Sequence, residues 1–199
     1  IDVKDKVEII KNPNPWVSRA ALKLDFALNN FNITNLNGIA LDIGASTGGF
    51  TDVLLHYGCK KVFAVDVGRG QLHKKLREDQ RVISFEGFDA RNLTGSEIPE
   101  VDFIVCDTAF ISLTKVLKTP LKFGKPSCIL VALVKPQFEV GRKNISKKGI
   151  VRDHNLLENA CKKVTDFLIL EGWPVESIIE CPVRGGGGAI EFLIKARKS

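Results

Sequence analysis

The sequence predicts an α/β fold, a three-layer sandwich in which helices cover both faces of a mostly parallel sheet. Short apolar runs alternate with segments of helical periodicity along almost the whole chain. The runs are apolar throughout instead of alternating with polar residues, which is typical of strands buried on both faces of a parallel sheet. The chain has 199 residues, of which 44% are hydrophobic and 26% charged, as expected for a globular chain of about one domain.

The elements follow one another in the order that such a sheet requires. The first helix is expected to start at a Ser18 cap and to run to about Asn30, because its apolar residues recur at a helical spacing. Strands are then expected at residues 39–43, 61–67, 82–85, 103–106 and 128–134. Further helices are expected at residues 50–57, 71–78 and 156–171. Two late strands, at 175–181 and 189–196, are separated by a glycine tract and are predicted to form an antiparallel pair.

The start of the chain differs in composition from the rest. Residues 1–15 are polar and contain Asn12-Pro13-Asn14-Pro15, so we interpret them as a linker or remnant and assign the folded domain to residues 16–199. The chain contains no methionine, and we therefore expect it to be a piece of a longer protein.

Charge and cysteine usage narrow the class of protein. The formal net charge of +6 favours an anionic partner such as nucleic acid or an anionic membrane. The five cysteines form no C-x-x-C pair, so we expect neither a metal site nor disulfides, and we expect a reducing, cytoplasmic location. Since no apolar run approaches the roughly 20 residues of a membrane span and no signal peptide is visible, no stable membrane association is expected.

A turn of small residues follows the first strand and indicates a cofactor site. The residues of this turn are Gly44, Ala45, Ser46, Thr47, Gly48, Gly49 and Phe50. The next strand ends near Asp66, 22 residues after Gly44, where a carboxylate can bind ribose hydroxyls. Ser46 breaks the dinucleotide pattern G-x-G-x-x-G, and no lysine follows as in a P-loop. Acids at Asp42 and Asp66 suit an adenosine that carries a cationic sulfur. The alternative is a plain strand–helix turn with Asp66 as a helix cap.

Four charged residues are candidates for catalysis. Lys135 and Asp107 each follow an apolar strand, Glu191 interrupts a late apolar strand, and Lys23 lies among apolar residues of the first helix. Methylation of a ribose hydroxyl requires a base that removes its proton, and a lysine with a lowered pKa can act as that base; we choose Lys135. Taken singly, each residue could instead be an ordinary surface charge or cap.

Five segments read together resemble a known family. They are residues 17–24, 41–51, 110–113, 133–139 and 190–193, and they include the strings Ser-Thr-Gly-Gly-Phe-Thr-Asp and Val-Lys-Pro-Gln-Phe-Glu. They closely resemble the TlyA-type haemolysin family of ribosomal RNA methyltransferases, which belongs to the FtsJ-like group of 2′-O-methyltransferases. The resemblance extends over residues 16–197. The chain departs from the family pattern at Ala109 and Ala189, where serine and asparagine are usual.

The resemblance implies a Rossmann-like methyltransferase fold that uses S-adenosylmethionine. It implies a Lys-Asp-Lys-Glu tetrad at Lys23, Asp107, Lys135 and Glu191. It also implies that residues 44–50 and Asp66 hold the cofactor, with Asp89 near the adenine and Asp107 near the methionine end. Family members modify cytidines in ribosomal RNA and carry an N-terminal RNA-binding domain, which we expect to precede this chain.

Basic residues near these motifs are candidate RNA contacts. The candidates are Arg19, Arg142, Lys143, Lys147 and Lys148. The last four lie in a glycine-flanked segment that could grip phosphates beside the site, although a lysine-rich loop is also ordinary solvated surface.

The expected function is therefore methyl transfer from S-adenosylmethionine to a ribose 2′-hydroxyl, of a cytidine, in ribosomal RNA or ribosomal subunits, without a metal. The alternatives are a catalytically silent adenosine-binding module that assists ribosome assembly, a membrane-active haemolysin, and a nicotinamide dehydrogenase. The broken glycine fingerprint disfavours the dehydrogenase, and the absence of a long apolar run disfavours the haemolysin.

Overall fold

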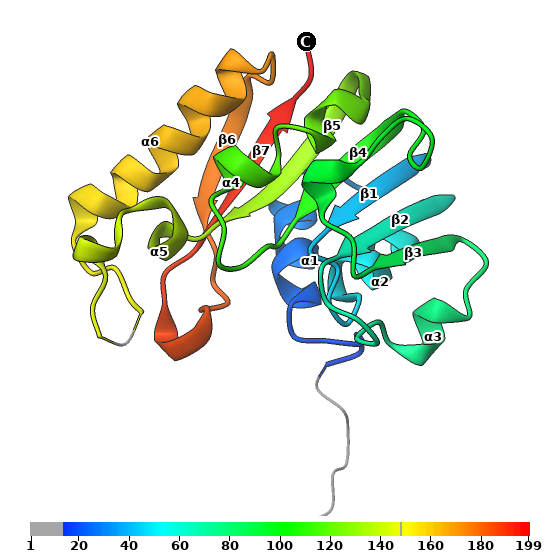
Figure 1. Ribbon diagram of the computed structural model, residues 1–199, viewed down its shortest axis with the longest axis horizontal. Helices are drawn as coiled ribbons and strands as arrows, with labels where there is room; N and C mark the ends of the chain where they lie inside the picture. Colours follow the sequence, from blue (N-terminus) through cyan, green and yellow to red (C-terminus); the bar gives the residue numbers. More distant parts are fainter. Residues whose placement is uncertain (1–13, 148) are drawn as a thin grey trace, which may run out of the picture.

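The computed structural model describes residues 14–147 and 149–199, which form one α/β domain (Figure 1). Residues 1–13, most of the expected linker, and Lys148 of the basic segment lie outside the described residues. The helices are α1 (Ala21–Asn30), α2 (Gly49–His56), α3 (Lys74–Arg77), α4 (Leu113–Val116), α5 (Pro136–Glu139) and α6 (His154–Leu170). Short 3₁₀ turns cover Ala90–Asn92, Pro120–Phe123, Arg142–Asn144 and Gly186–Gly188.

Seven strands form one sheet in the order β3-β2-β1-β4-β5-β7-β6. The strands are β1 (Ile39–Ile43), β2 (Lys61–Asp66), β3 (Val82–Glu86), β4 (Val101–Cys106), β5 (Gly124–Val134), β6 (Val175–Glu180) and β7 (Phe192–Arg197). Strands β1 to β5 pair in parallel, whereas β7 is antiparallel to both β5 and β6. The predicted three-layer sandwich with a late antiparallel pair is thus confirmed.

Helices cover both faces of the sheet (Figure 1). On one face α4 and α6 pack on alternate strand residues such as Leu41 and Ile104. On the other face α1, α2 and α3 pack on the residues of opposite parity, such as Ala40 and Val105. Because successive side chains of a strand point to opposite faces, strands that are apolar at every position can fill both cores. This explains why the sequence showed continuous apolar runs.

The reversed direction of β7 brings its first residues to the edge where the parallel strands end. Val134, the last residue of β5, pairs with Phe192, the first residue of β7. Continuing this antiparallel register by one residue places Lys135 opposite Glu191. Two of the candidate catalytic residues therefore lie opposite each other, although one follows its strand and the other precedes its strand.

The start of α1 differs from the prediction. Ala20, not Ser18, is the residue that caps α1, and it makes no side-chain hydrogen bond. The Ser18 hydroxyl is buried and has no hydrogen-bond partner among the described residues. It packs instead on the start of α2, where a Cβ on Gly49 would lie only 2.2 Å from Ser18 Oγ. The predicted cap at Ser18 was therefore wrong, because tertiary packing takes up this side chain.

Helix α3 is shorter than expected. It begins after His73, whose side chain accepts a hydrogen bond from the Lys75 amide and so caps the helix. The sequence offered no signal for this cap, because histidine is not among the preferred N-cap residues.

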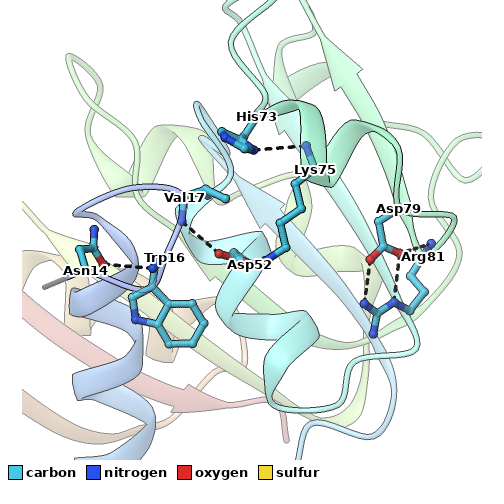
Figure 2. A network of polar contacts seen from close by, with 8 residues as sticks. All are labelled: Asn14, Trp16, Val17, Asp52, His73, Lys75, Asp79 and Arg81. Atoms are coloured by element: carbon cyan, nitrogen blue, oxygen red, sulfur yellow. Dashed lines mark hydrogen bonds and ion pairs between the residues drawn. The ribbon is translucent and has the colours of Figure 1, made fainter. Parts of the chain in front are cut away.

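A polar network ties the segment before α1 to helices α2 and α3 (Figure 2). Asp52 of α2 is 5% exposed. Its carboxylate accepts a hydrogen bond from the Val17 amide at 3.1 Å and from Lys75 Nζ at 3.0 Å. The network fixes where the chain enters the domain, and residues 18–20, which follow directly, reach the wall of the main pocket.

Candidate active site

A pocket of about 740 Å³ lies where β1, β2 and β4 end. Its size is within the roughly 300–1,000 Å³ of typical small-molecule sites. The predicted residues on its wall are Arg19, Gly44, Ala45, Ser46, Thr47, Gly49, Phe50, Asp66, Asp89, Asp107 and Lys135. Gly48, Lys23 and Glu191 are not on this wall. The pocket thus gathers most of the predicted cofactor residues at the ligand-binding edge of an open α/β sheet.

Gly44 and Gly48 are required in the turn for different structural reasons. Gly44 has a φ of +81°, and a Cβ there would lie 2.7 Å from the main-chain oxygen of Asp107. Gly44 thus lets the ends of β1 and β4 approach closely beside the pocket. Gly48 has a φ of +91°, and a Cβ there would lie 2.2 Å from Leu76 of α3. The role of Gly48 is therefore to turn the chain and admit α3, away from the pocket wall.

Asp66 is held at the pocket edge by main-chain amides. Its Oδ2 accepts a hydrogen bond from the Ser46 amide at 2.8 Å, and its Oδ1 accepts one from the Gly68 amide at 2.7 Å. No helix begins at Asp66, since α3 is capped by His73. The alternative interpretation of Asp66 as a helix cap was therefore wrong. A carboxylate has further lone pairs, which leaves it able to accept hydrogen bonds from a ligand.

Asp42 lies below the turn and is fully buried. Its Oδ2 accepts a hydrogen bond from Thr51 Oγ1 at 2.6 Å, whereas its Oδ1 has no partner among the described residues. Burial, with the nearby charges of Asp107 and Asp66, raises the pKa of Asp42 to about 7. The carboxyl group therefore titrates near neutral pH directly beneath the pocket.

Lys135 and Asp107 form an ion pair on the pocket wall. Lys135 Nζ lies 2.5 Å from Asp107 Oδ1, and the two side chains are only 12% and 13% exposed. Both residues line the pocket, so the pair lies on the pocket wall, with Asp107 Oδ1 buried against the ammonium group of Lys135.

Lys23 and Glu191 form a second, more deeply buried pair. Lys23 Nζ donates to Glu191 Oε2 at 2.6 Å, and the side chains are 11% and 3% exposed. The loop before β7 closes over this pair, because a Cβ on Gly185 would lie 2.2 Å from Glu191 Oε1. Any larger residue at Gly185 would have to displace the Glu191 carboxylate.

The two pairs lie near each other. The antiparallel register sets Lys135 opposite Glu191. Lys23 is paired with Glu191, and Asp107 is paired with Lys135. All four predicted tetrad residues therefore lie in one region beside the pocket. Their catalytic roles stay a prediction.

The remaining predicted residues have mixed surroundings. Asp89 is paired with Arg91 at 2.6 Å, which lowers the pKa of Asp89, and both residues line the pocket. Arg19 also lines the pocket, and its guanidinium donates to the main-chain oxygen of Arg184 at 2.9 Å. The basic residues Arg142, Lys143 and Lys147 are exposed.

Several residues of the pocket wall were not predicted from the sequence. They are Ser18, Val67, Gln71, Phe88, Arg91, Thr108 and Phe110. Most lie in loops that follow β2, β3 and β4, so a search of all loops at the carboxyl ends of the strands could have found them. Ser18 precedes the first helix and gave no such signal.

The fold and the pocket together define a Rossmann-like methyltransferase. Among solved structures with this fold, a protein described as an S-adenosylmethionine-dependent methyltransferase from Listeria monocytogenes superposes with a TM-score of 0.67 at 17% identity, over 91% of this chain and 100% of that one. A protein described as a hemolysin from Streptococcus thermophilus superposes with a TM-score of 0.90 at 43% identity, over 94% of this chain and 69% of that one.

The FtsJ-like methyltransferase family matches residues 16–198, and the chain belongs to that family. Hemolysin A of Brachyspira hyodysenteriae is 44% identical over 95% of this chain and 79% of its own length. The 16S/23S rRNA (cytidine-2′-O)-methyltransferase TlyA of Mycobacterium tuberculosis is 42% identical over 92% of this chain and 68% of its own length. The resemblance inferred from the motifs is thus confirmed.

Two features are absent from the part of the chain that the structure describes. No helix in residues 14–147 and 149–199 has the length and apolar character needed to cross a membrane. In the same part of the chain, no three His, Cys, Asp or Glu side chains are grouped so as to hold a metal ion.

Proposed function

We propose that this chain transfers a methyl group from S-adenosylmethionine to the 2′-hydroxyl of a cytidine ribose in ribosomal RNA. The observation that carries the proposal is the Lys135–Asp107 pair on the pocket wall, beside the glycine turn and next to the Lys23–Glu191 pair. The names of the relatives supply the substrate: the 42%-identical protein of M. tuberculosis is an rRNA (cytidine-2′-O)-methyltransferase.

The pocket fits S-adenosylmethionine in chemistry as well as in size. Asp66 would bind the ribose hydroxyls, and the exposed apolar side chain of Val67 with Phe88 would border the adenine. Asp89 would lie on the adenine side and Asp107 on the methionine side. The cofactor carries a positive sulfonium, which the surrounding carboxylates of Asp66 and Asp107 favour. When bound, it supplies an electrophilic methyl group.

Lys135 is the proposed base. A ribose hydroxyl is a very weak acid and must lose its proton as its oxygen attacks. Lys135 Nζ, in its uncharged form, accepts that proton while the new C–O bond forms and the C–S bond breaks. Asp107 and Glu191 orient Lys135 and Lys23, and holding the reactants in line removes several kcal/mol of the barrier.

RNA would approach over the exposed basic residues. Basic residues follow α5, the short helix that comes directly after Lys135. They are Arg142, Lys143 and Lys147, and the sequence adds Lys148. Their charges would bind phosphates, and phosphate contacts position a substrate without reading its sequence. Arg19 lies on the pocket wall and would contact RNA closest to the reacting ribose.

The test is methyl transfer from radiolabelled S-adenosylmethionine to ribosomal RNA and to isolated subunits, with the product nucleoside identified by mass spectrometry. A 2′-O-methylcytidine product supports the proposal, and a base-methylated product overturns the choice of acceptor. Cofactor binding without transfer to any ribosomal RNA would favour the silent adenosine-binding module. Lysis of erythrocytes without transfer would favour a haemolysin, the activity that the names of two similar proteins suggest.

A further inference from the structure

A polar cluster around a buried carboxylate, separate from the tetrad, joins the segment after β4 to the segment after β5; its lysine is 45% exposed. It consists of Ser112 before α4, Glu139 at the end of α5 and Lys163 within α6, and we call it the Glu139 cluster. The Glu139 side chain is only 1% exposed. Burial of a carboxylate costs free energy unless the group is paired and hydrogen-bonded. We therefore expect the partners of Glu139 to offset the cost of burying it.

Both carboxylate oxygens of Glu139 are fully engaged. Oε1 accepts a hydrogen bond from the Leu113 amide at 2.7 Å. Oε2 accepts one from Ser112 Oγ at 2.6 Å and one from Lys163 Nζ at 2.9 Å. Lys163 Nζ also donates to the main-chain oxygen of Glu139 at 3.0 Å. Because the carboxylate at the centre of the network is buried and hydrogen-bonded at both oxygens, we expect it to rigidify the segments that it joins.

The Glu139 cluster and the Lys135–Asp107 pair connect the same two segments, residues 107–113 and residues 135–139, at their opposite ends. Ser112 follows Asp107 by five residues, and Glu139 follows Lys135 by four. Between the two ends, the rings of Phe110 and Phe138 contact each other with centroids 5.3 Å apart. The two segments are therefore joined at three successive points.

Phe110 shows that the first segment is held under constraint. Its φ is +65°, a left-handed conformation that is uncommon for a bulky residue. Such a conformation persists only where the surrounding structure imposes it. The side chain is also 92% exposed at the pocket, so burial of the ring does not offset the strain. The bonds of Ser112 and Leu113 to Glu139 hold the chain just beyond Phe110.

We propose that the Glu139 cluster is a positioning device for the active site. It fixes residues 107–113 against residues 135–139, and so sets the geometry of the Asp107–Lys135 pair and of the exposed ring at the pocket mouth. None of its three residues is on the pocket wall, so they act through other residues. The effect on rate rests on the proposed function, whereas the effect on structure does not.

The chain offers matched variants. Lys163→Met removes the cation but keeps a long apolar side chain, and Ser112→Ala removes the hydroxyl that Ser112→Thr retains. Lys162→Met is the control, because Lys162 is the neighbouring residue of α6 and forms an ion pair of 2.6 Å with Asp166 that is largely exposed. Exposed pairs of this kind contribute little.

Hydrogen exchange tests the structural part without reference to activity. In Lys163→Met and Ser112→Ala, amide exchange in residues 108–113, above all at Leu113, should accelerate at least about tenfold. Lys162→Met and Ser112→Thr should match the unmodified protein, and binding of S-adenosylmethionine should stay within about twofold by calorimetry. Unchanged exchange in Lys163→Met overturns the proposal whether or not the protein is active.

Kinetics test the functional part. We expect kcat to fall about tenfold to a hundredfold in Lys163→Met, with KM for the cofactor unchanged and with Ser112→Thr close to the unmodified protein. Failure of the unmodified protein to transfer methyl groups would overturn the proposed function, and the exchange data would still decide on the cluster. An active protein whose Lys163→Met variant has the same kcat would overturn the positioning role. If the loss of rate disappears at assay temperatures well below the Tm of the variant, the cluster contributes to stability alone. That result would also overturn the positioning role.

Discussion

The two sides of the pocket are built from different kinds of contact. On the turn side, formed by β1, β2 and the glycine turn, main-chain amides bind the Asp66 carboxylate, and all of the partners lie within one β-α-β unit. On the pair side, formed by α1, β4, β5 and β7, side-chain ion pairs join residues as far apart as Lys23 and Glu191, 168 positions along the chain. Local chain geometry thus shapes the turn side, and sheet topology shapes the pair side.

This difference implies a division of labour. Backbone amides and a fixed carboxylate suit the binding of a nucleoside, whereas lysine–carboxylate pairs suit the movement of a proton. Changes on the turn side should therefore weaken cofactor binding, and changes on the pair side should slow transfer. Each of the following measurements either sharpens that division or breaks it.

The largest expected effect is on the pair side. Lys135→Ala should lower the rate of methyl transfer by at least about 10³-fold, because the proton acceptor is removed, and should leave cofactor affinity nearly intact by calorimetry. Lys125→Ala is the matched control, since Lys125 is at the opposite end of β5 and its ion pair with Asp102 is partly exposed. A normal rate in Lys135→Ala, or an equal loss in Lys125→Ala, would break the division.

The next effect concerns Asp42, a buried carboxyl group beneath the turn that forms no ion pair with a described cation. Because burial raises its pKa from 3.8 to about 7, the folded protein retains a proton that the unfolded chain loses above about pH 4. The resulting stability is present below about pH 4 and is lost as the pH rises to 7. Asn cannot ionise, so Asp42→Asn should gain about 3 kcal/mol relative to the unmodified protein between pH 5 and pH 8.

Urea unfolding at pH 5 and pH 8 measures this change in the free energy of unfolding. Parallel pH profiles for the two proteins would show that Asp42 is ionised at both values, contrary to the expectation.

On the turn side itself, Asp66→Ala should weaken binding of S-adenosylmethionine by about 1–3 kcal/mol, the loss expected for hydrogen bonds to a charged group. At saturating cofactor its kcat should stay near that of the unmodified protein. Asp79→Ala, which removes a carboxylate paired with Arg81 outside the main pocket, is the control. Unchanged affinity in Asp66→Ala would remove Asp66 from the cofactor site.

The smallest effect should come from the basic residues beyond the pair side. Each phosphate contact to single-stranded RNA contributes roughly 0.7 to the slope of log K against log salt concentration. Neutralising Arg142, Lys143, Lys147 and Lys148 should therefore reduce the magnitude of that slope by up to about 3. Neutralising Lys60 and Lys61, at the opposite edge of the sheet, should leave the slope unchanged. An identical slope in the quadruple variant would show that these four residues do not contact phosphates and are ordinary solvated surface.

The fold could be predicted from the sequence because its signals are local. Each apolar run is a strand, and the bounds agree within a few residues, as for β1 (Ile39–Ile43) and α6 (His154–Leu170). The errors lie where tertiary contacts override local preference. Ser18 packs on the start of α2 instead of capping α1, and His73 caps α3 although histidine is a poor cap.

The two sides of the site were not equally predictable. The turn side could be read from small residues followed by Asp66. The pair side depended on the family resemblance, because no spacing rule tells that Lys23 meets Glu191. The Glu139 cluster was missed altogether: Lys163 has the sequence context of an ordinary helix residue, and only the packing of α6 brings it to Glu139.

The glycine loop before β7 has a practical consequence for spectroscopy. Gly186, one position beyond the crowded Gly185, has open space where a Cβ would be, and its φ is not among the positive values. All five natural cysteines are buried, and burial raises the pKa of each thiol, so they resist alkylation. A Gly186→Cys variant should therefore take a maleimide dye or spin label at one place, beside the Lys23–Glu191 pair, without removal of any native thiol.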